Sequence, residues 1–427
     1  MSIRSAAKRQ AALPLFAHSE SVAPVRVNVG EDFRTALRCF TFSGAPTAEV
    51  EEGGLHYFVN EFWTSRQRQA HSIQEISYRA CFKPQLPEFF IARRTDTGGR
   101  VYDPFSGRGT TAVQAALMGR KPIANDVNPL SAILVRPRLD PPPRAAIEAR
   151  LAGLDLSRGR FTDEQNGLLA FYHPDTLRQI CALRDYLLER AASRRMDGAD
   201  EWIRMVAINR LTGHSAGFFS VYTLPPNQAV SIGSQQKINA ARNQTPPLRD
   251  IAAIIRRKTR TLLTDGLPLP HPSALLMTGP ADATPELGDG EVDLLVTSPP
   301  FLDVVDYEGD NWLRCWFAGI DVNAVRIDRH KGVPGWEAFV RRSFTEFARV
   351  MRPGGFVAFE VGEVRGGKVL LERHVAEAIQ GLPFSVLGVM VNAQAFTKTA
   401  NCWGVTNNKG GTNSNRIVMA ERTGSVS

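Results

Sequence analysis

Residues 100–126 read RVYDPFSGRGTTAVQAALMGRKPIAND, and this stretch decides the fold class. It begins with a short run that ends in an acid (RVYD), passes through a turn with two glycines, continues as an Ala-rich helical run and closes with a second short run ending at Asp126. A strand, a tight turn, a helix and a second strand in this order predict two parallel strands joined by a helical crossover.

The same alternation returns in the second half of the chain. Short apolar runs typical of strands lie at 274–279, 292–298, 356–362, 384–391 and 416–421. Runs with helical spacing lie at 336–351, which stops at an Arg-Pro-Gly-Gly sequence, and near 370–380. Strands that alternate with helices predict an α/β fold, with a mostly parallel sheet covered by helices on both faces.

Two proline clusters, at 140–143 and 267–272, interrupt this pattern. Proline continues neither a helix nor the interior of a sheet, so such clusters mark boundaries. The block between them has helical periodicity at 176–190 and 251–263, and its segment 213–247 predicts irregular chain. We therefore expect an α/β domain formed by 71–139 and 273–427, interrupted by a mainly helical insert at 140–272. Residues 1–70 form an N-terminal extension.

Composition excludes several classes of protein. The 427 residues are 43% hydrophobic and 22% charged, which is ordinary for a globular chain and unlike disordered, collagenous or disulfide-stapled proteins. The five cysteines and eight histidines show no metal-ligand spacing, so no metal is expected. No apolar run reaches the ~18 residues of a membrane helix. With no secretion signal visible at the N-terminus, we expect a cytoplasmic protein that does not contact membranes.

The charge distribution indicates a polyanionic partner. The net charge is +8 and the pI is about 9.4. Residues 202–260 hold nine Arg or Lys side chains and a single acid, Asp250. Such a segment suits nucleic-acid phosphates, and amide side chains among the basic residues could read base edges. The candidate contacts are Arg242, Arg256, Arg257, Lys258, Gln235 and Gln236.

The glycine turn indicates a nucleoside cofactor. Gly107, Gly109 and Ala112 match the pattern G-x-G-x-x-G/A between a strand and a helix, and Asp126 ends the next strand. The glycines let the backbone approach a ligand, and the acid accepts hydrogen bonds from ribose hydroxyls. This pattern alone does not separate nicotinamide from S-adenosylmethionine. A carboxylate at the strand tip, Asp103, serves an ammonium group better than a pyrophosphate and favours S-adenosylmethionine.

A second motif, Thr297-Ser298-Pro299-Pro300-Phe301, follows the strand-like run VDLLV. The two prolines stiffen this corner and leave their carbonyls as acceptors. The Ser298 hydroxyl and a proline carbonyl could accept the two N–H bonds of an exocyclic amine while a planar base stacks on Phe301. An amine held in this way is oriented to attack a methyl group in line, provided that the base has left the duplex.

Together these motifs resemble those of S-adenosylmethionine-dependent amino-methyltransferases of DNA. The resemblance rests on DPFSGRGTT (103–111), IANDVNP (123–129), TSPPF (297–301) and NSNRIVMAER (413–422), and extends to FKPQLPEFFI (82–91) and RVMRPGGFVAFEVG (349–362). The serine makes the TSPPF motif similar to that of the cytosine-N4 branch. The resemblance implies a Rossmann-like methyltransferase sheet with one late antiparallel strand, S-adenosylmethionine as cofactor and double-stranded DNA as substrate.

The resemblance also implies roles for individual residues. Cofactor binding falls to Lys83, Pro84, Asp103, Phe105, Gly107, Gly109, Thr110, Thr111, Asp126 and Asp282. Catalysis falls to Ser298, Pro299, Pro300 and Phe301. The cofactor motif precedes the catalytic motif here, which leaves the insert as the expected target-recognition region. A member of this family could also have a cognate restriction endonuclease as partner and associate with the nucleoid.

Other functions remain open on the sequence alone. Methylation of the adenine-N6 amine, in DNA or in RNA, uses the same chemistry. An NAD-dependent oxidoreductase would use the glycine turn but leaves TSPPF and the basic insert without a role. A DNA-binding regulator without catalysis is disfavoured by the intact motif residues. Ring-carbon methylation is disfavoured because that chemistry uses a cysteine nucleophile, normally after proline, and the chain has no Pro-Cys pair.

Overall fold

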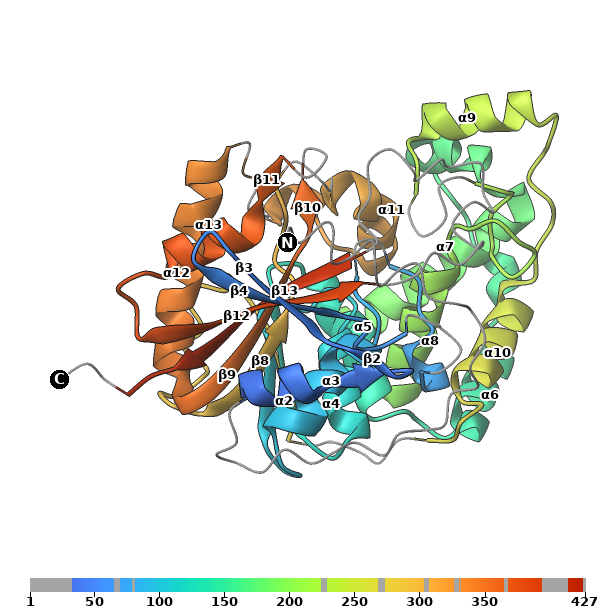
Figure 1. The fold of residues 1–427 in the computed structure, drawn as a ribbon. Helices are drawn as coiled ribbons and strands as arrows, with labels where there is room; N and C mark the ends of the chain where they lie inside the picture. The colour runs from blue at the N-terminus through green and yellow to red at the C-terminus, as the bar shows by residue number, and fades with distance from the viewer. Residues whose placement is uncertain are drawn as a thin grey trace.

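The computed structural model describes residues 33–64, 70–78, 81–223, 229–267, 273–302, 307–325, 330, 332–364, 368–393 and 414–424. A twisted sheet runs through the centre of the molecule, with helices on both of its faces and a helical block at one end (Figure 1). No helix in these ranges is both long enough and apolar enough to cross a membrane.

The central sheet has nine strands. Their spatial order is β3 (Ala48–Glu52), β4 (Leu55–Asn60), β12 (Phe384–Ala393), β13 (Ser414–Arg422), β9 (Met351–Val361), β8 (Val292–Thr297), β5 (Arg100–Asp103), β6 (Lys121–Asp126) and β7 (Leu275–Thr278). Two short two-stranded sheets are formed by β1 (Thr41–Phe42) with β2 (Ala45–Pro46), and by β10 (Glu363–Val364) with β11 (Val369–Leu370).

Strand directions confirm the predicted α/β class. Strands β7, β6, β5, β8 and β9 form a continuous parallel run. The late strand β13 is antiparallel to both of its neighbours, β9 and β12, as the resemblance implied. The carboxyl ends of β5, β6 and β8 therefore meet at one edge of the sheet, where parallel α/β sheets bind their ligands.

The two faces of the sheet pack against different helices because side chains alternate along each strand. On β9, Phe356 and Ala358 join a cluster with the helices α2 (Phe33–Cys39) and α3 (Gln85–Arg94). Their neighbours Val357 and Phe359 join a cluster with α12 (Val333–Val350) and α13 (Leu371–Ala378) on the opposite face. Both faces of β9 are thus buried, as expected for a strand of a sheet that helices cover on both faces.

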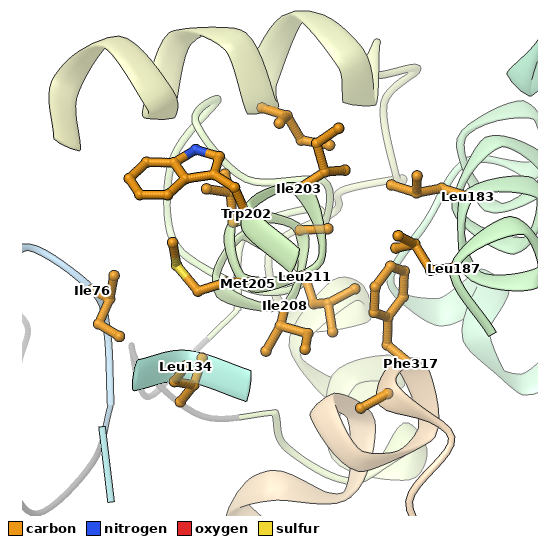
Figure 2. Packing of buried hydrophobic residues seen from close by; sticks show 14 of the residues in the cluster. Ile76, Leu134, Leu183, Leu187, Trp202, Ile203, Met205, Ile208, Leu211 and Phe317 are labelled. Carbon is orange, nitrogen blue, oxygen red and sulfur yellow. The ribbon is translucent and has the colours of Figure 1, made fainter. Parts of the chain in front are cut away.

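The block between the proline clusters is helical, as predicted. Its helices are α6 (Arg144–Ala152), α7 (Pro174–Ala192), α8 (Gly198–Arg210), α9 (Ile232–Ala241) and α10 (Ile251–Leu262). Figure 2 shows that Trp202 and Ile208 of α8 pack in one cluster with Leu134 of α5 (Leu130–Leu139) and Phe317 of α11 (Tyr307–Ala318). The insert therefore shares a hydrophobic core with helices of the α/β domain.

Two predictions differ from the structure. Residues 213–247 were expected to be irregular, but 232–241 form α9, whose first turn is capped by the Ser231 hydroxyl accepting the N–H of Ser234. Part of the N-terminal extension, residues 48–60, adds two strands to the sheet, because β4 pairs in parallel with β12. The Asn- and Gly-rich segment 394–413 lies outside the described residues.

Candidate active site

The glycine turn lies between β5 and α4 (Thr110–Leu117), as the sequence indicated. Gly109 has φ of +77°, and a Cβ atom there would lie 2.2 Å from Cγ2 of Val135 on α5. Glycine is therefore required twice, for its backbone conformation and for the approach of α5. Gly107 also has a positive φ, +51°, and a Cβ atom there would face the Tyr78 ring at 3.5 Å.

Asp126, at the end of β6, holds this turn in place. Its Oδ2 accepts the N–H of Gly107 at 2.8 Å, and its Oδ1 accepts the N–H of Asn128 at 2.9 Å. Burial raises the pKa of Asp126, and these two backbone hydrogen bonds oppose that rise. Each carboxylate oxygen can accept a second hydrogen bond, so the side chain can still receive ribose hydroxyls.

Asp103 lies buried at the end of β5 and connects the two motifs. Its Oδ1 accepts the hydroxyl of Thr297, the last residue of β8, at 2.5 Å, and the N–H of Phe105 at 3.2 Å. Burial raises the pKa of Asp103 to about 7, and the hydrogen bond from Thr297 is the largest effect that opposes the rise. The TSPPF corner is thereby tied to the strand that carries the glycine turn.

The corner itself is supported by two buried side chains that the sequence did not single out. The indole Nε1 of Trp336, on α12, donates to the carbonyl oxygen of Pro300 at 2.9 Å. Ser298 follows β8 directly beside Glu360 of the paired strand β9, and a hydrogen bond from its hydroxyl opposes the rise that burial causes in the pKa of Glu360. Glycine at position 362 lets the Phe301 ring lie close to the chain, because a Cβ atom there would be 2.9 Å from the ring atom Cε2.

One pocket, of about 850 Å³ and open to solvent, is lined by both motifs. Its lining residues are Tyr78, Cys81, Phe82, Pro104, Phe105, Ser106, Gly107, Arg108, Thr110, Asp126, Val127, Asn128, Ala281, Ser298 and Pro300. Phe105, Gly107, Thr110 and Asp126 from the predicted cofactor set and Ser298 and Pro300 from the predicted catalytic set thus lie around the same space.

Arg108, between the two glycines, holds a wall of this pocket. Its guanidinium donates to the carbonyls of Ile76 at 2.7 Å (Nη1) and Phe82 at 3.3 Å (Nη2). These bonds hold the segment that contributes Tyr78, Cys81 and Phe82 against the glycine turn. The sequence pattern treats position 108 as variable, so it gave no signal for this role. Lys83 and Pro84 line a smaller hollow of about 240 Å³ that shares Arg108 with the pocket.

Other predicted cofactor residues lie beside the pocket rather than on its wall. Thr111 is buried, and its hydroxyl donates to the carbonyl of Val296 at 3.1 Å. Asp282 follows β7, and its Oδ2 accepts Nε–H of Arg342 at 3.0 Å, while its neighbour Ala281 lines the pocket. A direct contact of either side chain with a cofactor stays a prediction.

The predicted DNA contacts divide into exposed and internally bonded side chains. Gln235 is fully buried and donates to the Tyr222 carbonyl at 3.1 Å, so it does not present its amide to the surface. Arg256 pairs with Glu148, with Nε and Oε2 3.1 Å apart. Burial lowers the pKa of Lys258 to about 8. Gln236, Arg242 and Arg257 are exposed, although Arg257 Nη2 also donates to the Ala216 carbonyl at 2.8 Å and the Arg242 guanidinium lies over the Tyr222 ring.

Ligand-type side chains for a metal gather elsewhere. Within the described residues, Glu337, His374 and Glu377 lie close together on α12 and α13. His374 Nδ1 already lies 2.7 Å from Glu337 Oε1. None of the three lines the pocket, so they contribute nothing to the chemistry described here.

The sheet order and the pocket at its carboxyl edge define a Rossmann-like α/β fold of the methyltransferase type. Comparison with known families is consistent with that class. Residues 48–133, which include the glycine turn, match the model of the N6/N4 DNA methylase family.

Two curated relatives are type II methyltransferases. M.BsoBI of Geobacillus stearothermophilus is 24% identical over 335 residues, which cover 68% of this chain and 63% of that protein. M.MjaII of Methanocaldococcus jannaschii is 36% identical over 74 residues, 17% of this chain and 14% of that protein. The chain thus spans less than two thirds of each relative. Its similarity is to the N4/N6 DNA methyltransferases.

Solved structures give only distant likenesses. Geranyl diphosphate C-methyltransferase from Streptomyces coelicolor A3(2) aligns over 80% of this chain and 78% of its own, with 8% identity and a TM-score of 0.33. A proposed DNA modification methylase from Thermus thermophilus is 21% identical over 32% of this chain and 47% of its own, with a TM-score of 0.19. With TM-scores this low, these two structures give no further information on the fold described above.

Proposed function

We propose that this protein is an S-adenosylmethionine-dependent DNA methyltransferase that modifies the exocyclic N4 amine of a flipped cytosine. The observation that carries the proposal is the pocket lined by both motifs, Gly107 and Asp126 on one side and Ser298 and Pro300 on the other. A nucleoside cofactor and a nucleobase must meet in one space for a methyl group to pass between them.

The residues around the glycine turn suit this cofactor. We assign the ribose to Asp126, which retains acceptor capacity on both oxygens, and the ammonium of the methionine end to the Asp103 region at the tip of β5. Phe105 offers an apolar wall. S-adenosylmethionine supplies an activated methyl group: a carbon–nitrogen bond forms as the carbon–sulfur bond breaks, and the bonding electrons stay with sulfur.

The TSPPF corner suits an exocyclic amine. The Ser298 oxygen can accept one N–H bond of the amine. We assign the second N–H bond to a proline carbonyl of the corner, either that of Pro299 or that of Pro300, whose oxygen can accept a second hydrogen bond beside the Trp336 indole. Accepting both bonds orients the amine nitrogen toward the methyl group and stabilises the positive charge that develops on it.

Cytosine is preferred to adenine because the corner carries a neutral serine where the adenine branch usually carries an acid. Methylation of the adenine-N6 amine remains the alternative within the same chemistry. Mass spectrometry of nucleosides from the DNA of expressing cells separates the two. We expect N4-methylcytosine, and N6-methyladenine alone would overturn the choice of base.

DNA binding is assigned to the exposed basic side chains of the insert. Arg242 and Arg257 are free of carboxylate partners among the described ion pairs, and Gln236 is exposed on α9. We propose that these residues face the duplex, with phosphate contacts setting the register of the protein. A cognate restriction endonuclease and a cytoplasmic, nucleoid-associated location belong to the same proposal, by analogy with the type II relatives.

An NAD-dependent oxidoreductase is the competing proposal from another class. It gives no role to the Ser298 corner, which lines the same pocket as the glycine turn. A ligand that binds only the folded state raises the melting temperature. We expect S-adenosylhomocysteine to raise it and NAD to leave it unchanged, and the reverse result would favour the oxidoreductase.

A further inference from the structure

Glu360 is a buried carboxyl directly beside the TSPPF corner. It lies on β9, whose pairing with β8 places Thr297 opposite Phe359, one residue before Glu360. Its side chain is 8% exposed. The sequence motif that contains it gave it no role, because an acid at the end of an apolar run is also common at the surface.

The apolar surroundings make this carboxyl costly unless it is bonded. Glu360 follows Phe356 and Ala358 in the alternation of β9, and both of those side chains pack in the cluster with α2 and α3. A carboxylate in such a position needs hydrogen bonds to offset its desolvation. Burial raises the pKa of Glu360, and the hydrogen bonds from Ser298 and Asn415 lower it.

The neighbouring strand fixes one oxygen of Glu360. Asn415, at the start of β13, donates from Nδ2 to Glu360 Oε1 at 3.1 Å. The next residue, Arg416, is held by a buried ion pair with Glu372 of α13. Asn415 is thereby anchored, and Glu360 is oriented between Asn415 on one side and Ser298 on the other.

We propose that Glu360 is a positioning residue for Ser298: it accepts the serine hydroxyl proton in a hydrogen bond, so that the serine oxygen faces the base amine as an acceptor. This inference rests on the proposed amino-methyltransferase function. A hydroxyl has one donor and two lone pairs. When its proton points to Glu360, the lone pairs are left for the amine in the pocket.

The same arrangement gives the surplus proton a path. When the amine nitrogen bonds to the methyl carbon, it becomes positively charged and must lose one of its protons. That proton passes to the Ser298 oxygen as the serine proton passes to the Glu360 carboxylate, which becomes neutral. Glu360 later releases the proton to water, so one proton leaves for each methyl group transferred. A buried carboxyl that favours protonation suits the role of acceptor.

Glu360→Gln tests the proposal because it keeps the size and one oxygen for Asn415. The new amide group would donate to Ser298 and turn the serine proton toward the pocket, where it opposes the amine protons. We expect kcat to fall roughly 10²-fold, the scale of one positioned proton acceptor. The dissociation constant of S-adenosylhomocysteine should stay unchanged, because Glu360 does not line the cofactor side of the pocket. Glu421→Gln, at a partly exposed position on β13, is the matched control.

A binding measurement gives a readout apart from turnover. The duplex that the wild type methylates is compared with one whose target cytosine is replaced by pyrimidin-2-one, which lacks the amine. If Glu360 sets Ser298 as the acceptor, Glu360→Gln lowers the ratio of the two dissociation constants roughly tenfold, the scale of one hydrogen bond. An unchanged ratio together with wild-type kcat overturns the inference.

Two further outcomes are distinguishable. If Glu360→Gln does not fold, Glu360→Asp replaces it: the shorter carboxylate should lower kcat at unchanged cofactor affinity, and wild-type kcat in that variant overturns the inference. If the wild type itself methylates neither cytosine nor adenine amines in DNA, the proposed function fails, and the inference fails with it for that separate reason.

Discussion

At the scale of single residues, hydrogen bonds hold the TSPPF corner in place. The Thr297 hydroxyl donates a hydrogen bond to Asp103, and the Trp336 indole donates one to the Pro300 carbonyl. The Ser298 hydroxyl interacts with the Glu360 carboxyl. Each bond joins the corner after β8 to a different element, namely β5, α12 and β9. The corner is therefore held on three sides, which is the preorganisation that electrostatic catalysis needs.

Trp336→Phe removes one of these supports while keeping an aromatic ring in place. The partly buried Pro300 carbonyl would lose its indole partner, and the loss of one hydrogen bond costs about 0.5–1.5 kcal/mol. We expect the free energy of unfolding to fall by that amount and kcat to fall by up to roughly tenfold, since 1.4 kcal/mol corresponds to a factor of ten. Unfolding in denaturant and single-turnover methyl transfer measure the two effects.

Trp202→Phe is the matched control. Trp202 is also fully buried, and its Nε1 donates to Thr259 Oγ1 at 3.0 Å inside the insert. This variant should lose similar stability and keep wild-type kcat in the folded protein. Equal losses of kcat in both variants would show that Trp336 acts only through stability.

The raised pKa of Asp103 predicts a pH effect on stability. The folded protein keeps a proton on this carboxyl up to a pH of about 7, whereas the unfolded chain releases it near the ordinary Asp value of about 3.9. Between these values the folded state binds more protons, so the free energy of unfolding falls as the pH rises. Asp103→Asn removes this contribution. Denaturant titrations from pH 4 to 8 should show a shallower decline in the variant, and identical declines would contradict the pKa assignment.

The sequence indicated the residues of the two motifs, but not the side chains from other elements that contact them. Glycine turns and proline corners have local signatures, so residues such as Gly107, Asp126, Ser298 and Pro300 were found and lie around one pocket. Trp336 and Glu360 come from α12 and β9, and only the fold brings them to the corner. Gln235 was chosen as a polar residue in a basic segment, but tertiary packing buried its amide.

Individual elements show where periodicity succeeds and where it fails. The apolar faces of α7, α10 and α12 were visible in the sequence because each buries a stripe of large apolar side chains. Helix α9 was missed because its only buried side chain within the described helix is Gln235, so no apolar stripe marks it. Its polar start signal, Ser231, was the one local clue.

The close contact between α4 and α5 at Gly109 gives a prediction at the scale of single elements. Gly109→Ala would place a Cβ atom 2.2 Å from Val135 and force a positive φ on an alanine. Gly381→Ala shares the φ of +77° but has no atom within 4 Å of the new Cβ, so it isolates the backbone cost.

We expect Gly381→Ala to lose about 1–2 kcal/mol of stability, the cost of a left-handed conformation. Gly109→Ala should lose clearly more and also lose affinity for S-adenosylhomocysteine, because α4 must shift. Thermal unfolding and calorimetric titration measure both quantities. Equal destabilisation of the two variants would show that the contact between α4 and α5 tolerates a methyl group.

We expect the exposed arginines of the α9–α10 region to affect the salt dependence of DNA binding. Replacing Arg242 and Arg257 with Gln should lower the slope of log K against log salt by about 0.9 for each phosphate that the protein no longer neutralises. Arg256→Gln is the control, because its charge is already paired with Glu148. An unchanged slope in the double variant would show that neither arginine contacts a phosphate.

At the scale of the whole molecule, the central sheet has nine strands. Its two outermost strands on one side come from the N-terminal part of the chain. Tyr57 and Val59 of β4 are fully buried against β12, and Asn392 Oδ1 of β12 accepts the N–H of Phe62 at 2.7 Å. The sequence pattern indicated the α/β class, and the family resemblance implied the late antiparallel strand. It did not indicate this pairing, because contacts between residues more than 300 positions apart leave no local pattern.

At this scale the molecule brings two motifs about 190 residues apart in sequence to neighbouring strand ends, and the division of work between them is the central claim. In the proposed function, the glycine turn binds the cofactor and the proline corner orients the amine. The most direct test is Ser298→Ala, with Ser343→Ala, at a fully buried serine away from the pocket, as control.

The measurement is methyl transfer to duplex DNA under single-turnover conditions, with the affinity for S-adenosylhomocysteine determined in parallel. The account predicts that Ser298→Ala lowers the transfer rate roughly 10²–10³-fold, the scale of one oxyanion-type hydrogen bond, and leaves cofactor affinity unchanged. Transfer at the wild-type rate, or a fall in cofactor affinity equal to the fall in rate, would contradict it.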